Sequence, residues 1–149
     1  MTIYAAYGAN THKRKMSERC PTAEIIGKSE LKDYRLLLRG EHKFRCHATV
    51  EPHDGFCVPL LIWRITSADE DALDRCEGFP DYYHKEFVDI LVNGESLNVM
   101  LYVVNDGYCV GIPSEQYHKT VRAGFEDAGF DLEVLSEARE YGKKVLGLI

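Results

Sequence analysis

The segment Ile3-Tyr4-Ala5-Ala6-Tyr7-Gly8-Ala9-Asn10 predicts a strand that runs into a sharp turn. Its first five residues favour a strand, and Gly8 lets the backbone bend away from that strand. Asn10 or Thr11 can then cap a short polar helix that continues through Arg19. The segment therefore predicts a strand, turn and helix within the first twenty residues.

The same turn is a candidate binding site. Free N–H groups at the start of a helix attract a carboxylate, and glycine lets a ligand approach the backbone closely. The residues that this hypothesis places around a ligand are Tyr7, Gly8, Ala9 and Asn10. The simpler interpretation is a tight turn in which Asn10 only caps the helix, and this arrangement is the commoner one at such junctions.

Further along the chain, strand-like segments predominate. They cover residues 23–26, 34–38, 47–50, 57–65, 87–92 and 96–104. Asn93-Gly94 separates the last two segments and is a strong hairpin signal. Because these strands are not separated by regular helices, we expect an α+β fold with a mostly antiparallel, strongly curved sheet or small barrel.

Three further helices are indicated by their capping residues. Ser67-Ala68-Asp69-Glu70 has the spacing of a capping box and predicts a helix that ends near Cys76. Ser114 can cap a helix that reaches Gly124 or beyond. Asp131 can cap a last helix over residues 131–141, with Gly142 as its stop signal.

Composition excludes several classes of partner. The chain has 149 residues and a formal net charge of −6, whereas a nucleic-acid binder needs a basic face. The first residues lack the pattern of a signal peptide, and the longest apolar run, near residues 58–63, is too short to cross a membrane. Without repeats or linkers, residues 1–149 are expected to form one domain that binds neither nucleic acid nor membrane.

The cysteines and histidines give no sign of a metal centre. The five cysteines are scattered and form no CxxC pair, and the six histidines lack the spacing of metal ligands. We therefore expect no metal, and reduced thiols in a cytoplasmic protein. His42 and His47 are interpreted as surface groups, and the basic run over residues 12–15 as a solvated helix face.

Glu77 is the candidate catalytic residue. It follows the predicted helix over residues 67–76 and precedes the turn Gly78-Phe79-Pro80. The negative end of a helix and apolar surroundings both raise the proton affinity of a carboxylate, so Glu77 could work as a general acid and base near neutral pH. The alternative is a solvated glutamate at a helix end.

Tyrosines form the third candidate group. A phenol combines an apolar wall with a hydrogen-bonding tip, which suits a pocket for a small polar ligand. Any single tyrosine is more often a half-buried packing residue. The tyrosines in question are Tyr4, Tyr7, Tyr82, Tyr83, Tyr102, Tyr108 and Tyr117.

Taken in order, four motifs resemble those of the γ-glutamylcyclotransferase-like family. Tyr7-Gly8-Ala9-Asn10 resembles the Tyr-Gly-Ser-Asn loop of that family, and Arg19-Cys20-Pro21 follows it as expected. The segments Leu73-Asp74-Arg75-Cys76-Glu77-Gly78 and Pro113-Ser114-Glu115-Gln116-Tyr117 match its later landmarks. Together these motifs extend the resemblance from Tyr4 to about Gly129.

The resemblance implies a small barrel of mixed strands with peripheral helices, and cleavage of a γ-glutamyl amide to 5-oxoproline and a free amine. It implies that Glu77 is catalytic, that Tyr7–Asn10 holds the substrate, and that Tyr102 and Tyr117 lie at the pocket. Ala9 replaces the family serine, so a hydroxyl contact is lost while backbone N–H groups remain. Since the chain is acidic overall, we expect those N–H groups to attract the anionic glutamyl substrate.

In the implied reaction, the α-amine of the substrate attacks its own γ-carbonyl group. The nucleophile is tethered, so neither a serine or cysteine nucleophile nor a cofactor is required. Two alternatives stay open: a cyclotransferase for another γ-glutamyl amine, such as an ε-lysine isopeptide or a biosynthetic intermediate, and a non-catalytic module that binds a small ligand or a protein. The assembly state, monomer or homodimer, is also open.

Overall fold

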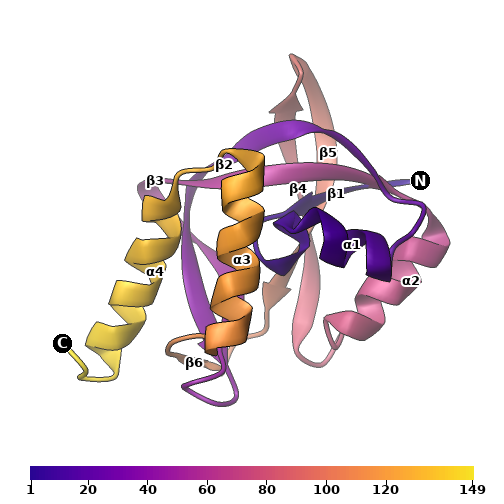
Figure 1. Cartoon of the computed structure of the whole chain (residues 1–149). Coiled ribbons are helices and arrows are strands. Elements are labelled where there is room, and N and C mark those ends of the chain that lie inside the picture. The colour runs from indigo at the N-terminus through magenta and orange to yellow at the C-terminus, as the bar shows by residue number, and fades with distance from the viewer.

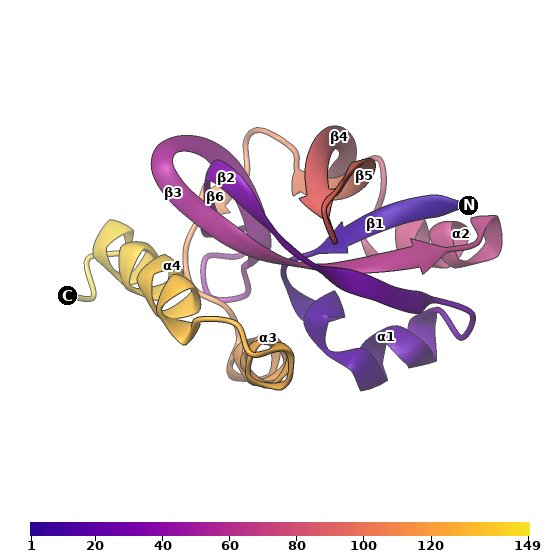
Figure 2. The same ribbon diagram turned by 90° about the horizontal axis from the view of Figure 1, so that it is seen from above.

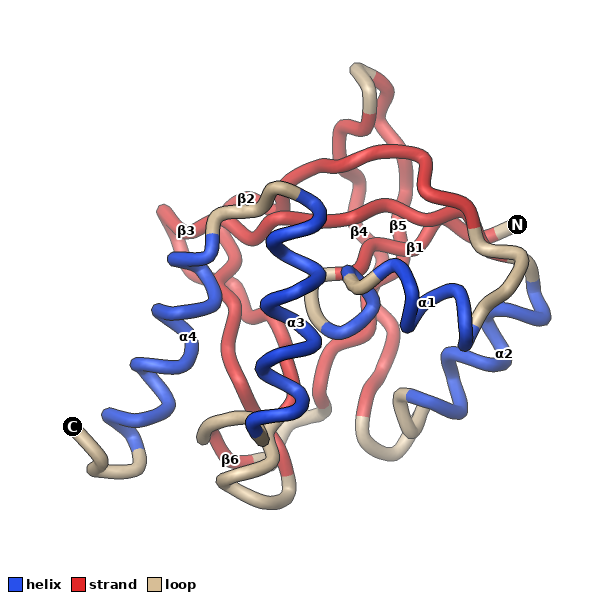
Figure 3. Tube along the Cα trace, viewed as in Figure 1, coloured by secondary structure: helices blue, strands red, loops and turns tan.

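The computed structural model describes residues 1–149 as a six-stranded sheet with four α-helices and one 3₁₀ turn around it (Figures 1 and 3). The strands are β1 (Thr2–Ala6), β2 (Glu24–Gly40), β3 (His47–Ile65), β4 (Tyr83–Val92), β5 (Glu95–Val104) and β6 (Cys109–Val110). The helices are the 3₁₀ helix η1 (Ala9–Thr11), α1 (Lys13–Arg19), α2 (Ser67–Cys76), α3 (Glu115–Ala128) and α4 (Leu132–Val145).

The sheet is mixed and strongly curved, which confirms the expected fold class. Its strand order is β4-β5-β1-β3-β2-β6, and only the β1–β5 pair is parallel. In the view from above, the long β2–β3 hairpin curls over at one end (Figure 2). Breaks in register between Ile25 and Gly27 and between Lys32 and Tyr34 accompany this curvature, because a bulge bends and twists the strand that carries it.

The prediction of four separate strands between residues 23 and 65 is wrong. The structure has two long strands, and their antiparallel ladder runs from the Glu24–Arg64 pair to the Arg39–His47 pair. The residues left out of the predicted strands are mostly polar and exposed. Residues 27–32 and 51–52 stay in the ladder because backbone hydrogen bonds do not depend on an apolar side chain.

The core lies on both faces of the sheet. Successive side chains of a strand point to opposite faces, and in β1 this separates Ala5 from its neighbours Tyr4 and Ala6. Ala5 belongs to the apolar cluster that α3 and α4 cover, whereas Tyr4 and Ala6 belong to the cluster covered by α1 and α2. β1 therefore connects the two halves of the core and ends at the candidate binding turn.

Two helix starts differ from the sequence prediction. Thr66, not Ser67, caps α2, and it forms a reciprocal capping box with Asp69. The Asp69 carboxylate is buried and also accepts a hydrogen bond from Thr22 at 2.7 Å, a tertiary contact that the local motif does not reveal. In the first helical segment, the His12 side chain caps α1, and η1 precedes it.

The end of α4 also differs from the prediction, whereas both late helix starts agree with it. Ser114 and Asp131 cap α3 and α4 as expected. Gly142 lies inside α4 and does not end it. A Cβ atom at this position would overlap the carbonyl oxygen of Gly111. This glycine therefore permits close packing.

The predicted hairpin is present. Asn93 and Gly94 both have positive φ angles, and they join β4 to β5.

All five cysteines are free thiols. None of the helices has both the length and the apolar character needed to cross a membrane.

Candidate functional site

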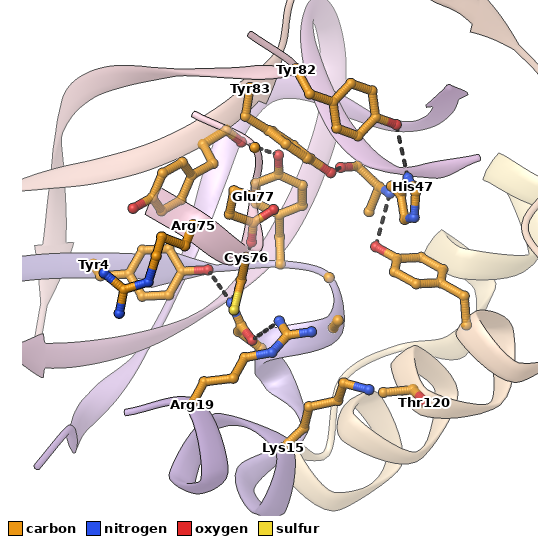
Figure 4. A pocket seen from close by; sticks show the side chains of 18 of the residues that line it. Tyr4, Lys15, Arg19, His47, Arg75, Cys76, Glu77, Tyr82, Tyr83 and Thr120 are labelled. Atoms are coloured by element: carbon orange, nitrogen blue, oxygen red, sulfur yellow. Dashed lines mark hydrogen bonds between the residues drawn. The ribbon is translucent and has the colours of Figure 1, made fainter. Parts of the chain in front are cut away.

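A cavity of about 520 Å³ lies where the end of β1, η1, α1, the end of α2 and the start of α3 meet the sheet (Figure 4). This one cavity is lined by the residues predicted to be catalytic or to bind substrate: Tyr7, Gly8, Ala9, Asn10, Glu77, Tyr102 and Tyr117. Of the other candidate tyrosines, Tyr4, Tyr82 and Tyr83 also line it, and Tyr108 does not. The residues predicted to be catalytic or to bind substrate come from four separate parts of the chain: residues 7–10, 77, 102 and 117. The fold therefore brings together groups that the sequence presents far apart.

Gly8 is needed for close packing at the turn. An added Cβ atom would lie 3.0 Å from the Cβ of Ala48 and 3.1 Å from the hydroxyl of Tyr117. The hydroxyl of Thr11 donates to the Gly8 carbonyl at 2.7 Å and closes the turn. Ala9 and Asn10, the first residues of η1, line the cavity, and N–H groups at the start of a helix have no partner within that helix.

Asn10 does not cap a helix, so that interpretation is wrong. Its side chain is buried, with only 2% of its surface exposed. The amide nitrogen donates to the hydroxyl of Tyr4 at 3.0 Å and to Glu77 at 3.5 Å. Its amide oxygen accepts from Arg19 at 2.9 Å, and its backbone carbonyl accepts from the indole of Trp63 at 3.1 Å. Asn10 therefore links the turn to the candidate acid–base residue.

Glu77 directly follows α2, where its backbone N–H donates to the carbonyl of Leu73 at 2.8 Å. The next residue, Gly78, has a φ angle of +62°, which a glycine adopts readily and which turns the chain away from the helix. Burial raises the pKa of the Glu77 carboxyl to about 7, and the positive charge of Arg19 opposes this rise. At neutral pH, Glu77 can therefore both accept and donate a proton.

The tyrosines of the cavity use their hydroxyl groups mainly within the protein. Tyr102 donates to the Asp74 carboxylate at 2.6 Å, and its backbone carbonyl accepts from the Tyr7 hydroxyl. The hydroxyl of Tyr117 accepts from the Ala48 N–H at 3.0 Å. Burial raises the pKa of Tyr7, Tyr102 and Tyr117, so these phenols stay neutral. They form a rigid, uncharged wall.

Sequence reasoning missed the cationic side of the cavity. Lys15, Arg19 and Arg75 all line it, although the net charge of the protein is negative. The prediction that residues 12–15 form a solvated face is wrong for Lys15, which extends with Arg19 from α1 towards the cavity (Figure 4). Their spacing of four residues places both on one face of a helix and is the signal that could have found them.

His47 is a second residue that the sequence placed wrongly. It is partly buried and lines the cavity instead of lying on the open surface. Its Nδ1 atom lies 2.8 Å from the hydroxyl of Tyr82, which in turn donates to the carbonyl of Arg39 at 2.9 Å. Burial lowers the pKa of His47, so the imidazole is neutral at physiological pH.

Comparison with known proteins agrees with the fold. The gamma-glutamylcyclotransferase of Mus musculus is 26% identical over 157 residues, covering 96% of this chain and 82% of the mouse protein. The Homo sapiens protein of the same name is 26% identical over 139 residues, covering 88% of this chain and 73% of the human protein. A solved structure of a gamma-glutamyl cyclotransferase superposes with a TM-score of 0.81 at 23% identity and covers 92% of this chain and 85% of that one. The sequence model of the family described as "Gamma-glutamyl cyclotransferase, AIG2-like" matches residues 4–122, and the chain therefore belongs to this family.

Proposed function

We propose that this protein cleaves a γ-glutamyl amide into 5-oxoproline and a free amine. The observation that carries this proposal is the position of Glu77, whose carboxyl group has a pKa of about 7 and shares one cavity with the Tyr7–Asn10 turn. The names of the relatives, which are 26% identical, support the same class of reaction. A carboxyl group that faced bulk solvent would instead have favoured a non-catalytic module.

The reaction requires one ring closure, the loss of two protons from the attacking nitrogen and the gain of a proton by the leaving nitrogen. The α-ammonium of the substrate gives a proton to the Glu77 carboxylate, and the resulting amine attacks the γ-carbonyl carbon of the same molecule. The C–N bond to the leaving amine then breaks as Glu77 returns the proton to that nitrogen. The ring nitrogen loses its second proton, which leaves with the free amine as an ammonium group. Because the nucleophile and the leaving group belong to one substrate, one carboxyl group can serve as both base and acid, and no cofactor is needed.

The Tyr7–Asn10 turn supports the substrate in this proposal. The N–H groups at the start of η1 bind the substrate carboxylate or polarise the carbonyl oxygen on which negative charge develops. Tyr102 and Tyr117 form the wall that orients the γ-glutamyl group, since both line the cavity and stay uncharged. The loss of the family serine at Ala9 leaves these backbone groups unchanged.

The charges of the cavity favour an anionic substrate. Lys15 and Arg75 line the cavity, and neither takes part in an ion pair within the protein. If the leaving amine of a γ-glutamyl amide carries a carboxylate, that carboxylate can form ion pairs with Lys15 and Arg75. We therefore expect amides whose leaving amine carries a carboxylate and no other charge to react faster than an ε-lysine isopeptide, whose leaving side carries a positive amino group besides its carboxylate.

The proposal also covers the extent of the catalytic domain and the compartment in which the protein works. Residues 1–149 act as one catalytic domain, since the cavity draws its lining from β1 through α3 and α4 packs on the same sheet. The five free thiols suit a reducing compartment such as the cytoplasm.

The test is an assay of 5-oxoproline release from a panel of γ-glutamyl amides that differ in the leaving amine. The Glu77→Gln variant should bind substrate but turn it over about 10²–10⁴-fold more slowly, since it cannot transfer the proton. Glu126→Gln, on the exposed side of α3, is the matched control and should retain full activity. Release of 5-oxoproline by Glu77→Gln at the wild-type rate would refute the role of Glu77. Binding without turnover in the wild-type protein would identify a ligand-binding module.

A further inference from the structure

Asn10 presents one end of its amide to Arg19 and the other end to Glu77. The guanidinium of Arg19 donates to the amide oxygen at 2.9 Å. A guanidinium has donors only, so the oxygen of Asn10 must face Arg19. The NH₂ group then faces the hydroxyl of Tyr4 at 3.0 Å and the carboxyl of Glu77 at 3.5 Å.

This direction of the amide matters for the proton on Glu77. An NH₂ group stabilises a carboxylate, whereas an amide oxygen in the same place would stabilise the protonated acid, because only the acid has an O–H to donate. Asn10 has 2% of its surface exposed, so water cannot readily replace either contact. The residue that fixes the amide direction therefore influences which form of Glu77 is favoured.

No other group in the protein neutralises Glu77. Neither Glu77 nor Arg19 takes part in any ion pair of the chain. The nearby phenols cannot supply positive charge, and burial keeps the pKa of each of them above its ordinary value. The titratable and charged groups that line the cavity with Glu77 are Tyr4 and Tyr7 from β1, Lys15 and Arg19 from α1, His47 from β3, Arg75 and Cys76 from α2, Tyr82 and Tyr83 at the start of β4, Tyr102 from β5 and Tyr117 from α3.

We propose that Arg19 is a positioning residue that acts on Glu77 through Asn10, by fixing the direction of the Asn10 amide and by placing a positive charge behind it. This inference rests on the proposed role of Glu77 as acid and base. Arg19 does not need to touch the substrate for this effect. Its guanidinium extends from α1 to the side of the cavity where Glu77 lies (Figure 4).

Removing Arg19 should make Glu77 harder to ionise. The positive charge of Arg19 lowers the pKa of Glu77, which burial raises to about 7. In Arg19→Met the charge is lost and the Asn10 amide is free to turn, so the titration midpoint of Glu77 should rise by about one pH unit. Arg19→Lys keeps the charge and a donor and should restore a midpoint near that of the wild type.

The direct measurement is a ¹³C NMR titration of the side-chain carboxyl groups, with the Glu77 signal assigned by its absence in Glu77→Gln. The matched control is Arg14→Met on the exposed face of the same helix, which should leave the Glu77 midpoint unchanged. A folded Arg19→Met variant with the wild-type midpoint would overturn the proposal. If Arg19→Met does not fold, Arg19→Gln serves instead, and an unchanged midpoint there would overturn it equally.

Kinetics separate positioning from substrate binding. The acid limb of the kcat/KM profile should move in Arg19→Met by the same amount as the NMR midpoint, while KM at high pH stays close to that of the wild type. A large rise in KM with no movement of the acid limb would assign Arg19 to substrate binding and overturn the proposal. The NMR titration needs no turnover, so a moved midpoint in a protein that releases no 5-oxoproline would reject the proposed function alone.

Discussion

Gly124 of α3 packs against Thr11 of η1 so closely that a Cβ atom at position 124 would overlap the Thr11 hydroxyl. That hydroxyl also closes the Gly8 turn. A helix that begins more than one hundred residues after the turn therefore holds the turn in place. The shape of the candidate binding site thus depends on the absence of a side chain in a different element.

Gly124→Ala should lower both stability and activity. At an exposed helical position this change stabilises a helix by about 1 kcal/mol, but here the methyl group has no room. We expect a loss of about 1–3 kcal/mol in the free energy of unfolding, measured with urea, and a raised KM. Ala123→Ser, at an exposed position of the same helix, is the control and should change little. Wild-type stability in Gly124→Ala would show that the turn can move without cost.

Gly8→Val should reduce turnover by about 100-fold, because a small displacement at a reacting centre is costly. The cause is steric, since the added side chain would meet Ala48 and Tyr117 at 3.0 and 3.1 Å before its branches are counted. Gly8→Ala adds only the Cβ atom and should lose much less. Steady-state release of 5-oxoproline measures the series, and wild-type activity in both variants would exclude a role for this glycine in the site.

Tyr102→Phe should affect stability more than catalysis. The lost hydroxyl donates a hydrogen bond to the Asp74 carboxylate, which also forms an ion pair with Lys85 at 3.0 Å. In the variant this carboxylate keeps Lys85 but loses the hydrogen bond from residue 102. We expect the free energy of unfolding to fall by about 2 kcal/mol, while kcat changes little. Chemical denaturation and the oxoproline assay together check this. A stable variant with a large loss in kcat would mean that the hydroxyl acts on the substrate.

Glu77→Gln should be more stable than the wild type at alkaline pH. The folded protein raises the pKa of Glu77 from 4.5 to about 7, so it binds this proton more tightly than the unfolded chain does. The resulting stabilisation is full below pH 4.5 and is lost as the pH rises through 7. Glutamine carries no charge, so the variant should gain up to about 3 kcal/mol at pH 8 and nothing at pH 4. Thermal unfolding at the two pH values measures this, and an equal difference at both would contradict it.

Local patterns in the sequence determined much of the architecture. The Asn93-Gly94 hairpin, the caps Ser114 and Asp131 and the end of α2 at Glu77 are as predicted. Each depends on neighbouring residues, because turns and caps form from backbone groups a few positions apart. The capping box of α2 was misplaced by one residue because the buried contact of Asp69 with Thr22 is not local.

Only the tertiary structure decided how the candidate site works. The amide of Asn10 reaches Glu77 across 67 positions, and the sequence indicated a helix cap instead. Lys15 was interpreted as part of a solvated helix face, but in the folded protein both Lys15 and Arg19 of α1 line the cavity. The pKa of Glu77 near 7 arises from burial by segments far away in the chain. A sequence specifies which groups are present, but desolvation and charge depend on distances that exist only after the chain has folded.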